Sequence, residues 1–369
     1  MYKILIGLFL SVLCLQAKCQ MQFDEGSFSE VLAKAKQEKR MVFMDCYTSW
    51  CGPCKMMVQD VFSQEDVGQF MNTRFVNVKL DMEKGEGREL AKKYQVKVYP
   101  TFLILNEDGE VIHKMVGGMK AEEFLQNVQN GIGEHSLYSY EKRYADGERD
   151  PQFVYSYIET LARAFMKERM EEVLHEYWGT LTDQEKSCKE NWMLVKRFVK
   201  NPALPEYKYL LEHKKDFDAA VSKDSVDRKI YDDLFPLIVN DCNEIIFHDK
   251  VNAAELLDTY KTCVTQSGIA GQDYLLDIVE FTKVFLSGDL KKALKMYDKK
   301  FSRLDSDARF DVTLQLNGML IRKGDAKMCE RGLELIERTM KDCGWSEDNP
   351  LFAAVVSGLK DKFKDNKDE

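Results

Sequence analysis

The stretch Met41-Val-Phe-Met-Asp-Cys-Tyr-Thr-Ser-Trp-Cys-Gly-Pro-Cys-Lys55 decides the fold. It begins with a short apolar run, Met41 to Cys46, of the kind that forms a central strand buried on both faces. Two cysteines, Cys51 and Cys54, follow at a point where a helix should begin, so their thiols lie side by side on its first turn. The unpaired amide groups and the dipole of a helix N-terminus favour a thiolate at Cys51.

This arrangement predicts a redox-active cysteine pair. A thiolate attacks a disulfide, and the thiol of Cys54, one turn on, can attack the resulting mixed disulfide and release the product. A zinc site is one alternative, but zinc needs four ligands, no second Cys-x-x-Cys occurs, and the five histidines are scattered. A structural disulfide is the other alternative, but it would not explain the preceding strand or Pro53. We therefore expect no metal and no cofactor.

Apolar patterns around the motif predict one α/β domain over residues 20–133, ending at Gly131-Ile132-Gly133. The order β-α-β-α-β-β-α predicts a mixed sheet with helices on its faces. The turn Asn106-Glu107-Asp108-Gly109 is a hairpin signal. The expected elements are a helix over 28–38, a strand over 41–46, a helix from the motif to about Phe70 with a break near Ser63, a strand over 75–80, a short helix closed by 91–94, strands over 101–105 and 111–116, and a helix over 121–128.

Residues 136–369 show helical patterns and little else, which predicts an all-α domain of helical hairpins. Asp150-Pro151 combines a capping residue with proline at the first helical position. Gly288-Asp289 recurs as Gly324-Asp325, 36 positions on, and a tetratricopeptide period is about 34. The match covers two weak units, so a tetratricopeptide-like array remains open.

The N-terminus has the pattern of a secretory signal peptide over residues 1–19. Lys3 precedes an apolar run, Ile4 to Leu15, that is too short to span a membrane, because a spanning helix needs about 20 apolar residues. No later run is long enough. We expect an exported protein, in the periplasm, where disulfides persist; lipid anchoring at Cys14 or Cys19 is the alternative. The net charge of −9 argues against binding to nucleic acid or anionic membranes.

The chain resembles the thioredoxin family over residues 22–133. Three features carry this resemblance: the motif Trp50-Cys51-Gly52-Pro53-Cys54-Lys55, Asp45 on the preceding strand, and Tyr99-Pro100-Thr101 before an apolar strand. Gly109 and Gly117 also match family glycines. The resemblance is greatest to exported branches such as the C-terminal domain of the electron-transfer protein DsbD.

The resemblance implies roles for residues beside the cysteine pair. Asp45 would be a buried acid with a raised pKa that accepts the Cys54 proton; its alternative is a turn-capping residue. Pro100 would be cis and, with the Tyr99 backbone, would hold an extended substrate strand; its alternative is a trans proline. Trp50 would form an apolar wall beside Cys51; its alternative is ordinary core packing.

Two features depart from the family pattern or extend it. The family has a lysine near the buried acid, whereas Asn77 stands there and Lys79 follows two residues along on the same face. Cys46 lies on the opposite strand face from Asp45, and we expect a buried apolar residue rather than a third redox thiol. Buried packing is also expected for the five cysteines of the helical region, Cys188, Cys242, Cys263, Cys329 and Cys343.

The predicted function is reduction of disulfides in client proteins. The Gly52-Pro53 pair between the cysteines indicates the reducing direction by resemblance to thioredoxin. Reduction in an oxidising space needs an electron donor, which implies a membrane relay of the DsbD type as a partner. One alternative is a disulfide oxidase or isomerase that uses the same pair. The other is a binding or scaffold protein that acts mainly through its helical domain.

Overall fold

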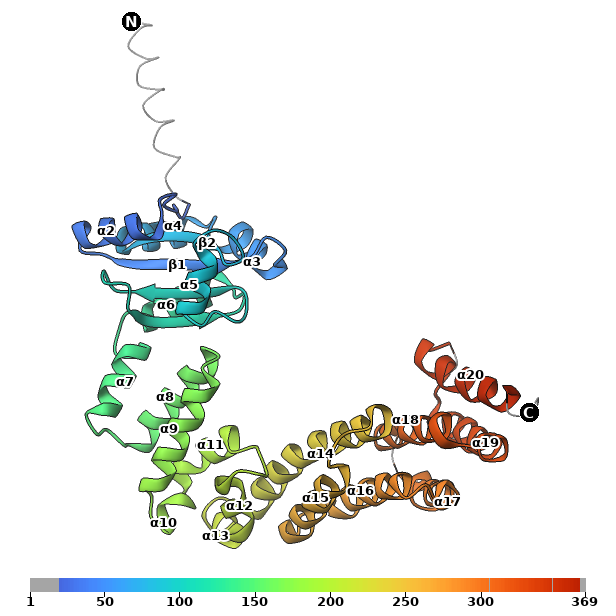
Figure 1. Cartoon of the computed structure of the whole chain (residues 1–369). Helices are drawn as coiled ribbons and strands as arrows, with labels where there is room; N and C mark the ends of the chain where they lie inside the picture. The colour runs from blue at the N-terminus through green and yellow to red at the C-terminus, as the bar shows by residue number, and fades with distance from the viewer. Residues whose placement is uncertain (1–19, 305, 347, 366–369) are drawn as a thin grey trace, which may run out of the picture. The chain divides into compact units, whose positions relative to one another are not determined.

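The computed structural model describes residues 20–304, 306–346 and 348–365 (Figure 1). The predicted signal peptide, residues 1–19, lies outside the described residues. The chain divides into two compact units, Met1–Leu181 and Thr182–Glu369. The domain limits predicted from the sequence, 20–133 and 136–369, remain a prediction.

A four-stranded mixed sheet forms the centre of the first unit, in the order β2-β1-β3-β4. β1 runs parallel to β2 and antiparallel to β3, and β3 pairs with β4 in a hairpin. This is the predicted fold class, and every predicted strand is confirmed to within one residue. The strands are β1 (Met41–Tyr47), β2 (Phe75–Asp81), β3 (Thr101–Leu105) and β4 (Val111–Val116).

Helices cover both faces of this sheet (Figure 1). The long helix expected after the cysteine motif consists of three pieces, because the α-helix widens into a π-helical turn, η1, and then breaks at residues 62–64. The break near Ser63 was predicted and the π-helical turn was not. The elements are α2 (Phe28–Glu38), α3 (Gly52–Met56), η1 (Met57–Val61), α4 (Glu65–Arg74), α5 (Gly87–Lys93) and α6 (Ala121–Gly131).

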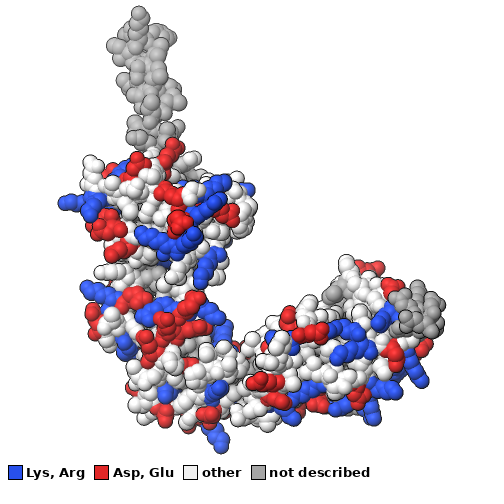
Figure 2. Space-filling model, in the orientation of Figure 1, with Lys and Arg blue, Asp and Glu red and all other residues white. Residues whose placement is uncertain are grey.

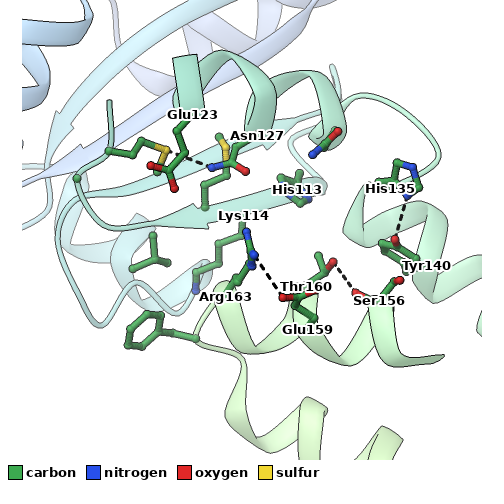
Figure 3. Close-up of a pocket in the computed structure, with 16 residues that line it drawn as sticks. His113, Lys114, Glu123, Asn127, His135, Tyr140, Ser156, Glu159, Thr160 and Arg163 are labelled. Carbon is green, nitrogen blue, oxygen red and sulfur yellow. Dashed lines mark hydrogen bonds and ion pairs between the residues drawn. The ribbon is translucent and has the colours of Figure 1, made fainter. Parts of the chain in front are cut away.

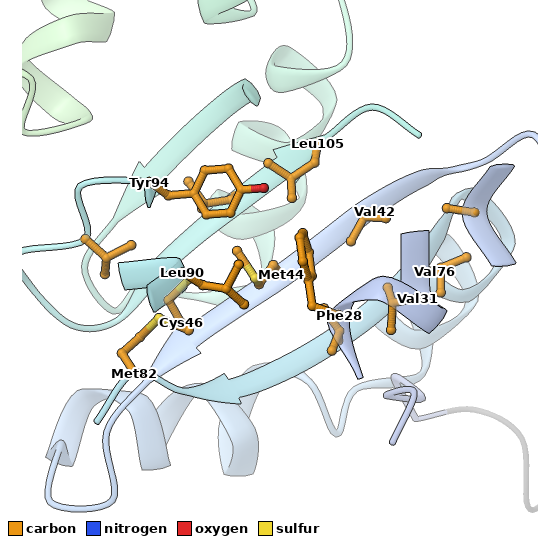
Figure 4. Close-up of a cluster of buried hydrophobic side chains, with 14 residues drawn as sticks. Phe28, Val31, Val42, Met44, Cys46, Val76, Met82, Leu90, Tyr94 and Leu105 are labelled. Atoms are coloured by element: carbon orange, nitrogen blue, oxygen red, sulfur yellow. The ribbon is translucent and has the colours of Figure 1, made fainter. Parts of the chain in front are cut away.

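Two apolar layers hold the sheet, one on each face. Val42, Met44 and Cys46 point into the layer under α2 and α5 (Figure 4). Phe43 points to the other layer, where its ring stacks on Phe102 with 5.7 Å between ring centroids. Since both faces of β1 are covered, its sequence is apolar without alternation apart from Asp45, as expected for a central strand.

Three further helices belong to the first unit: α7 (Leu137–Ala145), α8 (Pro151–Arg163) and α9 (Lys167–Thr180). α7 packs against β4, and the buried Leu137 amide donates a hydrogen bond to His113 Nδ1 at 3.2 Å. The predicted cap of α8 is confirmed, because the Asp150 carboxylate accepts from the amides of Gln152 and Phe153.

The described part of the second unit contains helices and no strand. Both Gly-Asp pairs precede helices that their aspartates cap, Asp289 for α17 and Asp325 for α19. Whether these helices form a repeat array stays a prediction. The elements are α10 (Asp183–Lys186), α11 (Lys189–Phe198), α12 (Pro205–Glu212), α13 (Lys214–Ala220), α14 (Lys223–His248), α15 (Ala253–Ser267), α16 (Gln272–Leu286), α17 (Leu290–Lys300), η2 (Phe301–Arg303), α18 (Ser306–Lys323), α19 (Ala326–Cys343) and α20 (Pro350–Asp365).

The cysteines of the second unit are all free thiols. Cys242, Cys263 and Cys329 are buried, as expected for packing residues. Cys188 and Cys343 are half-buried, so the expectation of buried packing is wrong for these two. Both stand at helix ends, Cys188 directly before α11 and Cys343 as the last residue of α19, where side chains are less enclosed.

Candidate active site

The cysteine pair lies at the junction of β1 and α3. Cys51 caps α3, its sulfur accepts the Cys54 amide hydrogen bond at 3.1 Å, and a disulfide joins the two residues. Pro53 falls in the first turn, where an amide would have no helical partner. Both sulfurs therefore sit where helix amides point outward, and such a position stabilises a thiolate once the disulfide is reduced.

Asp45 is a buried acid on β1, only 1% exposed. Burial raises the pKa of its carboxyl group to about 7, although the positive charge of Lys79 acts in the opposite direction. Neither carboxylate oxygen has a hydrogen-bond partner among the described residues, so no hydrogen bond replaces the lost hydration. The group is thus partly protonated near neutrality, as the family resemblance implied. Its proton-accepting role remains a prediction.

Lys79 stands directly beside Asp45 in the parallel pairing of β1 and β2. Its ammonium group lies 4.5 Å from the centre of the Tyr47 ring. Asn77 instead directs its amide group to the Gln22 carbonyl and to the Asn72 side chain. The lysine that lowers the pKa of the buried acid is therefore Lys79, two residues along from Asn77.

A small cavity of about 180 Å³ opens beside Cys54. Its walls include Tyr47, Lys55, Val58 and Lys79. Water can enter this cavity beside Cys54, because one water molecule needs only about 10–15 Å³ of such a cavity.

The Tyr99–Pro100 peptide bond is cis, as predicted. Pro100 directly precedes β3, and its carbonyl accepts a hydrogen bond from the Gly117 amide at 2.9 Å. The ring of Trp50 meets that of Tyr99 edge-on, with centroids 6.1 Å apart. Trp50 is 66% exposed, which excludes the core-packing alternative. The structure thus brings Trp50 and Tyr99 together at the surface beside the cysteine pair.

Sequence reasoning missed Glu83, whose carboxylate accepts a hydrogen bond from Trp50 Nε1 at 3.0 Å. Glu83 lies in the loop after β2, 33 residues further along the chain. No local pattern links the two positions, since their proximity depends on the parallel pairing of β1 with β2.

Comparison with known proteins places this domain in a family. A family model described as a thioredoxin-like domain matches residues 28–132. A thioredoxin-like protein of Synechocystis is 34% identical over 104 residues, which are 28% of this chain and 90% of that protein. The chain belongs to the thioredoxin family. The thioredoxin of Bacillus subtilis is 38% identical to this family member over 96 residues, covering 26% of this chain and 86% of the relative.

The match to the family model lies in the N-terminal part of the chain. The solution structure of a candidate disulphide-isomerase from Bacteroides thetaiotaomicron is 48% identical to this chain, with a TM-score of 0.29. The aligned region covers 31% of this chain and 93% of the isomerase chain. The chain spans only 58% of the length of rice chloroplast thioredoxin Y, to which it is 31% identical over 107 residues.

Proposed function

We propose that this chain is an exported protein-disulfide reductase that acts on disulfides of client proteins. The main observation that supports this proposal is the Cys51–Cys54 pair at the start of α3, together with the buried carboxyl group of Asp45 on the preceding strand. Thioredoxin-family membership over residues 28–132 supports thiol–disulfide exchange as the chemistry.

In the first step, the Cys51 thiolate attacks one sulfur of the client disulfide. A bond forms between Cys51 and that sulfur, the client disulfide breaks, and the second client sulfur leaves as a thiolate that takes up a proton. Trp50, Tyr99 and Pro100 hold the client segment beside Cys51, because the exposed Trp50 and the half-buried Tyr99 meet next to the pair and the buried cis Pro100 directly follows Tyr99.

In the second step, Cys54 loses its proton to Asp45 and attacks the Cys51 sulfur. The Cys51–Cys54 disulfide forms and the first client sulfur leaves as a thiolate, so the client gains two electrons and the pair loses two. A carboxyl group with a pKa of about 7 is matched to this transfer, since it is neither fully charged nor fully neutral at the working pH.

The reducing direction requires an electron donor for each cycle. We assign this role to a membrane relay of the DsbD type, with the protein in the periplasm after removal of residues 1–19. In the described part of the chain, no helix combines the length and apolar character needed to cross a membrane. Figure 2 shows acidic and basic side chains interspersed over the visible face of the first unit.

Measuring the reduction potential of the Cys51–Cys54 pair tests the direction. A reductase of this kind should fall near the thioredoxin value of about −270 mV, whereas an oxidase would approach the value of about −120 mV for DsbA. The Cys51→Ser protein should lose all exchange activity, and the Cys54→Ser protein should accumulate mixed disulfides with clients. A potential near the oxidant's value would overturn the reducing direction, and full activity of Cys51→Ser would overturn the enzyme itself.

We further propose that the helical region selects the client, because thioredoxin domains alone are permissive. The truncation that tests this should end at Leu181, since α7–α9 belong to the compact unit of the thioredoxin-like domain. Clients trapped by the Cys54→Ser protein should differ between the full chain and the chain that ends at Leu181. An identical set of trapped clients would contradict client selection by residues 182–369.

A further inference from the structure

A groove of about 720 Å³ runs within the first unit between β4 and α8 (Figure 3). This volume falls in the range of about 300–1,000 Å³ that binding sites occupy. Lys114 lies on one side, and Ser156, Glu159 and Arg163 lie on α8 across from it. Most of its lining is polar, which suits a hydrated polypeptide better than a small apolar molecule.

One wall of the groove is the edge of the sheet. β4 is the last strand in the order β2-β1-β3-β4, so only one of its two edges pairs with β3. The Gly117 amide donates to the Pro100 carbonyl, and hydrogen-bonded pairs alternate along an antiparallel ladder. Val116 and Lys114, opposite Thr101 and Leu103, therefore direct their amide and carbonyl groups away from β3, toward the groove.

The groove is continuous with the active-site surface. Gly118 lines the groove, and a side chain added at Gly118 would meet Pro53 Cβ at 3.4 Å. Gly117, the preceding residue, is hydrogen-bonded to Pro100. Gly118 therefore links the surface beside the cysteine pair to the groove that an extended chain attached to Cys51 would enter.

The rim of the groove carries an aromatic residue in an unfavourable backbone conformation. Phe165 has a φ of 55°, in the left-handed region that bulky residues rarely adopt. Its side chain also lines the groove and is 61% exposed. Asparagine or glycine would occupy this position with less strain, so stability of the free protein does not explain the ring.

We propose, on the basis of the reductase function above, that this groove binds an extended segment of the client polypeptide. The segment adds as a strand to the β4 edge at Lys114–Val116 and places an apolar side chain on Phe165. Strand addition to a free edge provides affinity through the backbone whatever the client sequence, while the ring provides a preference for apolar residues. The groove thus favours disulfides in unfolded or extended segments over disulfides in compact proteins.

The test uses the full chain and two symmetric disulfide-linked peptide dimers. The short dimer has about two residues on each side of the cysteine, and the long dimer has about ten, which reach roughly 30 Å when extended. Attack on either sulfur of a symmetric dimer gives the same products, so the two kcat/KM values can be compared directly. The wild-type protein should reduce the long dimer at least about tenfold more efficiently than the short one.

Phe165→Asn removes the ring and suits the left-handed backbone, so the variant should fold. The ratio of the long-dimer to the short-dimer kcat/KM should fall about fivefold, as for loss of an aromatic contact in an interface. Tyr138→Asn is the matched control, because Tyr138 is 53% exposed in the same unit and lies outside the groove. Its ratio should equal the wild-type ratio.

A second measurement follows the Lys114 and Val116 amides by hydrogen exchange in the Cys54→Ser protein joined to each peptide at Cys51. Exchange at both amides should slow with the long peptide alone. Equal exchange with the two peptides, or an unchanged ratio in Phe165→Asn, would overturn the groove while leaving the reductase intact. A ratio that rises with protein concentration would identify a second copy of this chain as the occupant and would also overturn the proposal. Failure to reduce either dimer would instead refute the proposed function.

Discussion

Substitution of Asp45 by asparagine should stabilise the thioredoxin-like domain, and increasingly so as the pH rises. The pKa of Asp45 is raised from 3.8 to about 7 in the folded protein because the carboxyl group is buried. Above pH 3.8 the unfolded chain releases a proton that the folded protein retains, so the wild-type protein loses stability as the pH rises toward 7. Above about pH 7 both states are ionised and the loss reaches its limit.

The size of this effect follows from the shift. Three pKa units at about 1.4 kcal/mol each correspond to about 4 kcal/mol above pH 7. Near pH 5 only about 1.2 units of the difference have accumulated, so about 1.7 kcal/mol is expected there. The amide of asparagine occupies the same space as the neutral carboxyl group and carries no charge, so the variant should lack this pH dependence.

Alkylation of Cys46 offers an assay confined to the right part of the chain. Cys46 is the neighbour of Asp45 on β1, is fully buried, and becomes reactive only when the sheet opens. The protein is kept oxidised, so that Cys51 and Cys54 do not react, and labelling of Cys46 is followed by mass spectrometry against guanidinium concentration. Comparison of variant and wild-type protein at one pH removes the intrinsic pH dependence of the thiol.

Asp60→Asn provides the control, because Asp60 is exposed on η1 and removal of its charge should change the labelling midpoint little at any pH. Equal midpoints for Asp45→Asn and wild-type protein near pH 8 would refute the assignment of Asp45 as a buried titrating acid. A stabilisation that grows as the pH falls would refute the sign of the linkage.

Three further predictions concern the first unit. Loss of the α8 cap in Asp150→Ala should cost about 1 kcal/mol, measured as the change in the free energy of unfolding. In Gly131→Ala the new methyl group would lie 2.6 Å from His113 Cδ2, so we expect a loss of about 1–3 kcal/mol, whereas Gly179→Ala, with open space around it inside α9, should be neutral or stabilising in the same assay. Burial lowers the pKa of His113 from 6.5 to about 4. Between these two pH values His113 therefore carries a proton in the unfolded chain but not in the folded protein. Stability should therefore fall by about 3 kcal/mol from pH 6.5 to pH 4 relative to His113→Asn; a constant difference over this range would contradict the assignment.

The elements around the cysteine pair were predictable because their signals are local. The apolar run at β1 is buried on both faces, and eleven residues from Asp45 to Lys55 carry the acid, both cysteines and the helix start. Short-range pattern and position within a helix are sufficient to predict such a site. The cis state of Pro100 came from the family resemblance, because nothing in the residues themselves demands it.

Charged residues in the second unit show where local patterns fail. Lys229 is buried on α14, where its ammonium group pairs with Asp233 and donates to the Val199 carbonyl at 2.7 Å. A pattern-based reading places both charges on a solvated face, since isolated buried charges are costly. Only the folded arrangement supplies the Val199 carbonyl, 30 residues away in sequence, that makes this burial tolerable.

The same contrast separates the reaction from the choice of client. The proposed exchange chemistry depends on a helix terminus and a neighbouring acid, which a short stretch of sequence encodes. The proposed client groove depends on a surface assembled from distant segments: α7 packs on β4, where His113 accepts a hydrogen bond from the Leu137 amide, and α7 also packs on α8. If the groove binds clients as proposed, a substitution at His113 or Gly131 should change which clients bind without altering the cysteine pair that exchanges electrons. Family membership thus predicts the reaction, whereas both proposed determinants of client choice involve helices that follow the thioredoxin-like domain.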